Sequence, residues 1–113
     1  MRPKSIHLIA AARPNFMKVA PLYHELARQN WCSPRVVHTG QHYDANMSDA
    51  FFRDLGLPEP AHHLEIGSGS HAEQTGRTMI AYEAVCLREC PDAIVVVGDV
   101  NATAACAMVG AKL

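Results

Sequence analysis

The sequence predicts an α/β protein with a doubly wound, parallel, Rossmann-like sheet. Short and almost continuous apolar runs alternate with longer segments in which apolar residues recur at helical spacing. Glycine and proline residues separate these segments. Strands that alternate with helices are joined by right-handed crossovers, which make the strands parallel and cover both faces of the sheet.

The predicted strands are Ser5 to Ala12, Arg35 to Thr39 and Ala93 to Val97. Each run is too short for a globular helix and is rich in apolar or β-branched residues, as is typical of strands buried on both faces. Proline or glycine follows each run and ends it.

Four helices are predicted between and after these strands. They are Asn15 to Gln29, Asp44 to Leu55, a helix that follows Ser70 and ends before Pro91, and a helix from Asn101 onward. Pro21 should kink the first helix, and Ser70 with Glu73 forms a capping box. The residues expected to face the core are Val19, Leu22, Leu26, Met47, Ala50, Phe51, Leu55, Ala72, Gly76, Met79, Cys86, Cys90, Ala105, Met108 and Val109.

Composition favours one soluble domain with a packed core and no internal boundary. Of the 113 residues, 49% are hydrophobic and 19% are charged. A net charge of -1 without a basic stripe argues against a nucleic-acid partner. The four cysteines lack a C-x-x-C pair and are expected to be small core residues in a reducing cytoplasm. The apolar start is too short for a signal peptide or a membrane span, so we expect a cytoplasmic protein without a membrane partner.

Ligands of parallel sheets bind beyond the carboxyl ends of the strands, so the residues after each strand are the candidate site. After the first strand, Arg13 and Lys18 straddle a helix N-terminus, where unpaired N–H groups favour an anion such as a diphosphate. The alternative is two solvated cations. After the second strand, the turn from Thr39 to Asp44 carries an amide, an imidazole and a phenol, although turns are usually polar anyway.

After the last strand, Gly98 allows a ligand to approach the backbone, and the carboxylate of Asp99 can act as a base. The alternative is that Asp99 or Asn101 caps the following helix. The histidines lack zinc spacing, so no metal is expected. The Gly67 to Ser70 loop matches no phosphate-binding motif and is interpreted as a helix entry.

Five motifs in order give the chain a family resemblance. They are Ala-Arg-Pro-Asn-Phe-Met-Lys-Val-Ala-Pro-Leu (12–22), Thr-Gly-Gln-His-Tyr-Asp (39–44), Met-Ser-Asp (47–49), Gly-Ser-Gly-Ser-His-Ala-Glu-Gln-Thr (67–75) and Val-Gly-Asp-Val-Asn-Ala-Thr (97–103). The chain resembles the non-hydrolysing UDP-N-acetylglucosamine 2-epimerases over nearly its whole length. The resemblance implies that residues 1–113 form an incomplete N-terminal lobe of the two-lobed glycosyltransferase-B fold, whose second, nucleotide-binding lobe is absent from this chain.

The implied reaction interconverts UDP-N-acetylglucosamine and UDP-N-acetylmannosamine by elimination and re-addition of UDP, without a cofactor. By residue match, Asp99 is a catalytic carboxylate, while Arg13 and Lys18 act at the nucleotide and leaving group. Gln41 and His42 match part of an activator site. The family's next catalytic motif, His-Val-Glu-Ala-Gly-Leu-Arg, is not in this chain, so we expect the isolated chain to be inactive.

Two other functions stay open. One is the hydrolysing relative, which releases UDP and free N-acetylmannosamine, and the other is a non-catalytic module that binds a UDP-sugar or dimerises. The chain ends inside a helical pattern at Lys112-Leu113, from which we expect a truncation. Because an incomplete sheet exposes apolar edges, we expect marginal stability or self-association as a homo-oligomer such as a dimer.

Overall fold

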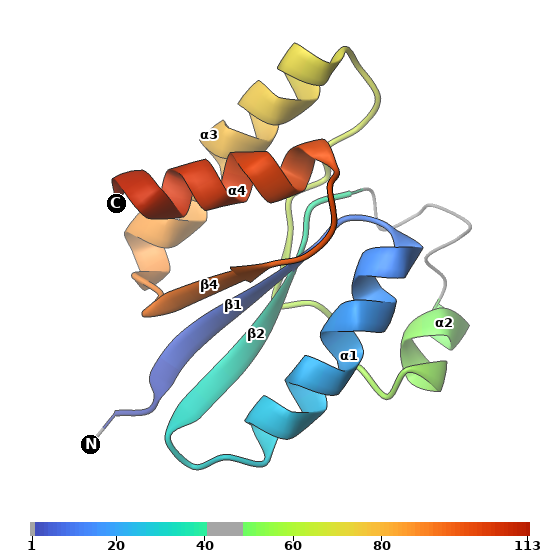
Figure 1. Cartoon of the computed structure of the whole chain (residues 1–113), viewed down its shortest axis with the longest axis vertical. Coiled ribbons are helices and arrows are strands. Elements are labelled where there is room, and N and C mark those ends of the chain that lie inside the picture. The colour runs from blue at the N-terminus through green and yellow to red at the C-terminus, as the bar shows by residue number, and fades with distance from the viewer. Residues whose placement is uncertain (1, 41–48) are drawn as a thin grey trace.

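In the computed structural model, which describes residues 2–40 and 49–113, strands alternate with helices as predicted (Figure 1). The elements are β1 (Lys4–Ala10), α1 (Arg13–Ala27), β2 (Cys32–His38), α2 (Asp49–Asp54), β3 (His62–His63), α3 (His71–Glu89), β4 (Ala93–Val96) and α4 (Asn101–Lys112).

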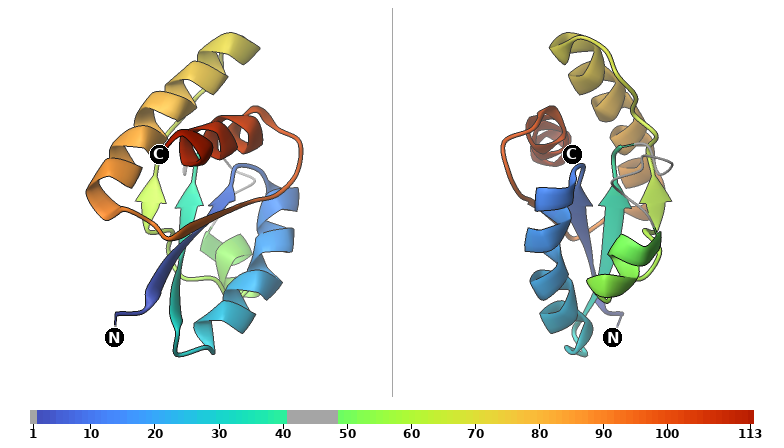
Figure 2. Two further views of the ribbon diagram at one scale, coloured as in Figure 1. Left: turned by 60° about the vertical axis from the view of Figure 1, so that its left-hand side comes forward. Right: turned by 90° about the vertical axis from the view of Figure 1, so that its right-hand side faces the viewer.

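The four strands form one parallel sheet in the order β3-β2-β1-β4 (Figure 2). The chain moves outward from β1 to β3 and then returns through α3 to place β4 on the other side of β1. The strand order therefore reverses between β1 and β4, and such a switch point is where ligands bind in open parallel sheets.

Successive side chains of β1 point to opposite faces of the sheet and serve two cores. Ile6, Leu8 and Ala10 pack against α1 and α2, whereas Ile9 packs against α3 and α4. In Figure 1, α3 and α4 cover one face and α1 and α2 lie on the other. The near-continuous apolar sequence of β1 follows from this burial on both sides.

The structure contains the predicted strands and helices, although some of their ends are shifted, and it contains one strand, β3, that was not predicted. α1 begins at Arg13 and remains continuous through Pro21, and β2 begins three residues earlier than expected. The expected start of the second helix, residues 44–48, lies outside the described residues. β3 was not predicted, because two histidines carry no β-branched or apolar pattern.

The capping box of α3 is confirmed. The Ser70 hydroxyl accepts the Glu73 N–H at 3.1 Å, and the Glu73 carboxylate accepts the Ser70 N–H at 3.0 Å. Met79 and Cys86 face the core as predicted. The prediction is wrong for Ala72 and Cys90, which are exposed. Cys90 is the C-cap of α3 with a φ of 50°, so it lies beyond the face that packs on the sheet.

Three further side chains expected in the core are exposed instead, namely Leu22, Ala50 and Met108. Phe16, Tyr82 and Cys106 are the better anchors of their helices because all three are fully buried. No helix among the described residues is long and apolar enough to cross a membrane.

Candidate active site at the carboxyl ends of the strands

Asn15 joins the turn after β1 to the turn after β4. It is only 5% exposed, and its Oδ1 accepts the N–H groups of Ala11 and Ala12 at 3.1 and 3.0 Å. Gly98 has a φ of +81°, and a Cβ at this position would lie 2.6 Å from Asn15 Nδ2. Only glycine fits this conformation and this close approach, so the two turns adjoin.

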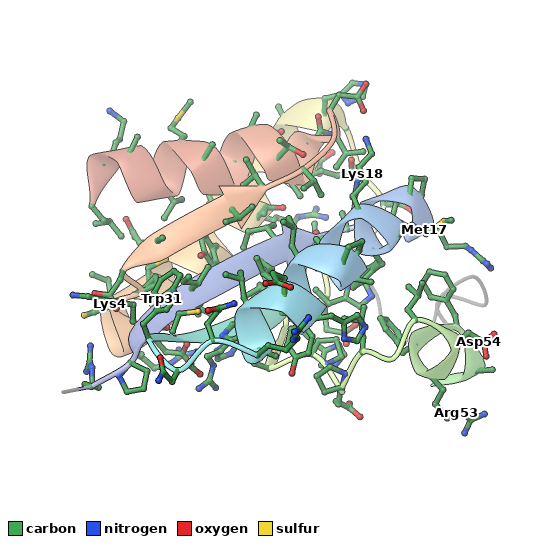
Figure 3. The ribbon with its side chains drawn as sticks, turned by 60° about the horizontal axis from the view of Figure 1, so that its bottom comes forward. Lys4, Met17, Lys18, Trp31, Arg53 and Asp54 are labelled. Atoms are coloured by element: carbon green, nitrogen blue, oxygen red, sulfur yellow. The ribbon has the colours of Figure 1, made fainter. Side chains whose placement is uncertain are left out.

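Lys18 lies on α1, and Asp99 lies in the turn after β4. Lys18 follows Asn15 by three residues and so shares its face of α1, the face that borders Gly98. Figure 3 shows Lys18 at the end of the molecule opposite Lys4, which begins β1. Asp99 follows Gly98 directly, is exposed, and has no hydrogen bond or ion pair with another described residue. We call the two turns with Lys18 and Asp99 the switch-point site.

Arg13 is directed toward α2. Its guanidinium carbon lies 4.3 Å from the centroid of the Phe51 ring, which is a cation–π contact. The start of α1 has fewer unpaired N–H groups than the sequence predicted. The N–H groups of Ala11 and Ala12 are bound by Asn15, and Pro14 has none. The start of α1 therefore offers a bound anion fewer backbone donors than predicted.

The alternative in which Asp99 or Asn101 caps α4 is wrong. The N-cap is Val100, and no side-chain hydrogen bond caps this helix. Instead, Asn101 Nδ2 donates to Gln74 Oε1 at 2.9 Å and lies 3.1 Å from His71 Nδ1. Asn101 therefore ties the start of α4 to the start of α3.

A cavity of about 180 Å³ lies where these elements meet. It is bounded by the residues after β1 and β2, by the first turns of α3 and by the start of α4. Its lining residues are Ala11, Thr39, Gly40, Ile66, Gln74, Thr78, Val100, Asn101 and Ala102. Most of these groups are small or polar and none is charged, so neither Lys18 nor Asp99 lines this cavity.

Not every predicted site residue can be placed. Gln41 and His42 lie outside the described residues, as does most of the predicted polar turn. The described part of that turn is tightly held, because Thr39 N–H donates to the Ala10 carbonyl at 3.0 Å. Within residues 2–40 and 49–113, no group of three or more His, Cys, Asp or Glu side chains is placed to hold a metal ion.

Asn15, His71 and Gln74 were not singled out from the sequence. Asn15 occupies the third position of α1, where an amide commonly binds the preceding N–H groups, so this signal was available. The pairing of Asn101 with His71 and Gln74 joins residues about 30 positions apart. No local pattern predicts such a contact.

A second cluster of titratable groups lies under α3, away from the switch-point site. Buried His7 of β1 lies 2.7 Å from the Tyr82 hydroxyl through Nδ1 and 2.9 Å from Glu89 Oε1 through Nε2. Glu89 Oε2 also contacts His62 of β3 at 2.5 Å and Arg35 of β2 at 3.6 Å. We call these five residues the Glu89 network. A single carboxylate thus joins α3 to three strands.

Burial and hydrogen bonding shift the pKa values in this network. Burial lowers the pKa of His7, and it outweighs the opposing effect of Glu89. Burial also tends to raise the pKa of Glu89, but hydrogen bonds from His7 and His62 lower it overall. Burial raises the pKa of Tyr82, which therefore remains a donor. These directions fit a neutral His7 that accepts from Tyr82 at Nδ1 and donates to Glu89 at Nε2.

The fold and the switch-point site together define a doubly wound α/β protein of the class that binds its ligand beyond the carboxyl ends of parallel strands. Within this class, the family model for UDP-N-acetylglucosamine 2-epimerase matches residues 24–113, and the chain belongs to this family. The resemblance stated from the sequence motifs is thereby confirmed.

Two relatives of this chain are 2-epimerases of different UDP-sugars. This chain is 44% identical over 110 residues to the UDP-N-acetylglucosamine 2-epimerase of Methanocaldococcus jannaschii. The aligned region covers 96% of this chain and 29% of the relative. This chain is also 44% identical over 105 residues to the UDP-2,3-diacetamido-2,3-dideoxy-D-glucuronate 2-epimerase of Pseudomonas aeruginosa, covering 93% of this chain and 30% of that protein.

The fold agrees with solved structures of these enzymes. The crystal structure of the Methanocaldococcus jannaschii enzyme in complex with UDP-GlcNAc and UDP matches with a TM-score of 0.88 and 42% identity. The match covers 96% of this chain and 30% of that chain. The predicted fold class is confirmed as a four-stranded parallel part of such an epimerase lobe, and the chain spans about 30% of the length of these relatives.

Proposed function

We propose that this chain contributes the first-lobe side of the substrate site of a UDP-N-acetylglucosamine 2-epimerase. The observation that carries the proposal is that Asn15 adjoins Gly98, so that α1, which carries Lys18, meets the turn that carries Asp99 at the switch point. A cation and a carboxylate are the groups that this reaction needs. The related structure that contains UDP-GlcNAc and UDP supports the choice of ligand.

The proposed reaction breaks a C–H bond and a C–O bond at neighbouring carbons. The Asp99 carboxylate takes the proton from C2, the electron pair forms a C1–C2 double bond, and the C1–O bond breaks with both electrons leaving on UDP. UDP then adds back to C1 while a proton reaches C2 from the opposite face. A positioned base and a stabilised leaving group both lower the barrier of such an elimination.

Lys18 and Arg13 have different parts in this proposal. Lys18 lies on the face of α1 that borders Gly98, so it stabilises charge on the diphosphate as the C1–O bond breaks. Arg13 is held over Phe51 and extends the cationic surface toward α2, where it contributes to binding of the nucleotide. Arg13 is therefore a binding residue, while Lys18 both binds and takes part in catalysis.

The size of the cavity suggests how the site is completed. About 180 Å³ is below the roughly 300 to 1,000 Å³ typical of small-molecule pockets, so it can hold only part of a nucleotide sugar. We propose that residues 1–113 form part of the first lobe and that the nucleotide binds between this part and a second lobe. We also propose, in line with the sequence, that the working protein is a cytoplasmic homo-oligomer such as a dimer and that the isolated chain does not turn over substrate.

A second candidate substrate is supported by a specific relative. The Pseudomonas aeruginosa protein is as similar to this chain as the archaeal enzyme, and it is a UDP-2,3-diacetamido-2,3-dideoxy-D-glucuronate 2-epimerase. Both sugars require the same chemistry at C1 and C2, so the switch-point site suits either. The glucuronate differs by a carboxylate at C6 and by a second acetamido group at C3 in place of a hydroxyl, and the carboxylate needs a further cationic partner.

The proposal is tested with a chimera in which this chain replaces the matching stretch of the Methanocaldococcus jannaschii enzyme. The chimera is incubated with UDP-N-acetylglucosamine in D₂O, and the products are followed by proton NMR. Epimerisation by proton removal should give UDP-N-acetylmannosamine with deuterium at C2 and intact UDP linkage. The same assay with the diacetamido glucuronate compares the two substrates.

Each other outcome has a defined meaning. Release of free N-acetylmannosamine with UDP would identify the hydrolysing reaction. Binding of UDP by a properly folded chimera without any C2 exchange would favour a non-catalytic binding module and contradict the proposed function. Production of UDP-N-acetylmannosamine by the 113-residue chain alone would contradict the need for a second lobe.

A further inference from the structure

Asn15 is buried between two turns and uses both ends of its side-chain amide. Oδ1 holds the N–H groups of Ala11 and Ala12, and Nδ2 lies against Gly98, where no Cβ fits. One end of the amide therefore organises the start of α1, which carries Lys18. The other end meets the residue directly before Asp99.

We infer that Asn15 is a positioning residue that fixes the separation of Lys18 and Asp99. This inference rests on the proposed function. In the proposed elimination, the base acts on the hydrogen of C2 while the cation acts on the diphosphate attached to C1. These atoms are only a few bonds apart, so the two side chains must be held at one spacing. A misplacement of about 1 Å can lower a rate about 10²-fold.

The amide is better suited to this task than a carboxylate. An aspartate at position 15 would still accept both backbone N–H groups, and its charge would favour the N-terminus of α1. Its second oxygen, however, would replace Nδ2 beside Gly98 and add a negative charge next to Asp99. A purely structural cap would tolerate this change, whereas a positioning residue would not.

The test uses Asn15→Asp and Asn15→Ala in the chimera described above, with Glu25→Gln as a matched control on the exposed face of α1. For Asn15→Asp we expect kcat to fall about 10²-fold with little change in KM and no fall in the thermal midpoint. The acid limb of the kcat profile should move to higher pH, because a nearby carboxylate disfavours ionisation of the base. The control should retain the parent kcat.

A second pair of variants tests the contact itself. Gly98→Ala should lower kcat, because its methyl group overlaps Asn15 Nδ2 and the backbone conformation disfavours alanine. Adding Asn15→Ala removes the overlapping amide. If the contact sets the spacing, this second change should partly restore kcat in the Gly98→Ala background, although it lowers kcat in the parent.

The outcomes separate this inference from the proposed function. An active parent chimera whose kcat and pH profile are unchanged by Asn15→Asp would overturn the positioning role and leave the proposed function intact. A fall of kcat that only follows a fall in thermal midpoint would also overturn it, since Asn15 would then be a structural cap. A folded parent chimera without epimerase activity would contradict the proposed function and this inference together.

Discussion

Charged groups at the carboxyl ends of the strands are exposed, whereas charged groups under α3 are paired with one another. At the switch-point site, Lys18 and Asp99 are exposed, and Asp99 has no ionic partner among the described residues. In the Glu89 network, one carboxylate is shared by two histidines and an arginine. The difference suggests that the first region keeps its charges available for a ligand, whereas the second uses them to attach a helix to the sheet.

Asp99→Asn in the chimera should have the largest effect and sharpen this contrast. Loss of a general base lowers kcat by about 10² to 10⁴-fold. Because the side chain is exposed, the free energy of unfolding should change by less than about 0.5 kcal/mol. Steady-state kinetics and urea unfolding measure the two effects, with Asp54→Asn on α2 as the control. A large loss of stability with normal kcat would reverse our assignment of this region.

Lys18→Gln and Arg13→Gln should separate the two cations. A charged hydrogen bond contributes about 1.5 to 3 kcal/mol, so Lys18→Gln should lower kcat by about one to two orders of magnitude. Arg13→Gln should mainly raise KM and lose a cation–π contact worth about 0.5 to 1 kcal/mol of stability. Steady-state kinetics on both variants provides the comparison. Equal effects on kcat would mean that both cations act on the leaving group.

Glu89→Ala should mainly reduce stability. It leaves buried His7 without its acceptor and removes the carboxylate shared by His62 and Arg35. Breaking a buried pair costs about 3 to 5 kcal/mol, and partial exposure of Arg35 reduces this to about 2 to 3 kcal/mol. Urea unfolding of the 113-residue chain should show a lower midpoint with an unchanged slope.

Glu83→Ala is the matched control, because Glu83 is an exposed glutamate on the same helix. It should change the free energy of unfolding by less than about 0.5 kcal/mol. If Glu83→Ala were as costly as Glu89→Ala, the loss would reflect α3 in general, and the contrast between the two regions would fail.

The two regions were not equally predictable from the sequence. The switch-point site follows from local patterns, since an apolar strand that ends in Arg-Pro or Gly-Asp places specific residues at its carboxyl end. Lys18 and Asp99 could be named for that reason. The Glu89 network could not, because it joins His7 to a residue 82 positions later and depends on the strand order.

Burial was also predicted less well than the elements themselves. Helical spacing defines a face, but the packing of α3 on the sheet decides which turn of that face is covered. This is why Tyr82 is buried and Cys90 is exposed. β3 was missed for a related reason, because its two residues are a strand only through their pairing with β2.

The Glu89 network should also make the stability of the chain depend on pH. Burial holds the pKa of His7 below its ordinary value of 6.5, so the unfolded chain binds this proton more readily than the folded chain. The associated stability is present above pH 6.5 and is lost as the pH falls below it. The lowered pKa of Glu89 acts in the same direction in a separate window, below 4.5.

His7→Gln removes the loss of stability below pH 6.5 that is linked to His7, and it leaves Lys18 and Asp99 unchanged. The variant should be less stable than the parent at pH 7.5, by about 1 to 2 kcal/mol, because the hydrogen bonds to Tyr82 and Glu89 are lost or weakened. Its free energy of unfolding should fall less than that of the parent between pH 7 and 5. Urea unfolding at several pH values measures this slope. If the free energy of unfolding fell with pH as steeply in the variant as in the parent, groups other than His7 would cause the acid sensitivity.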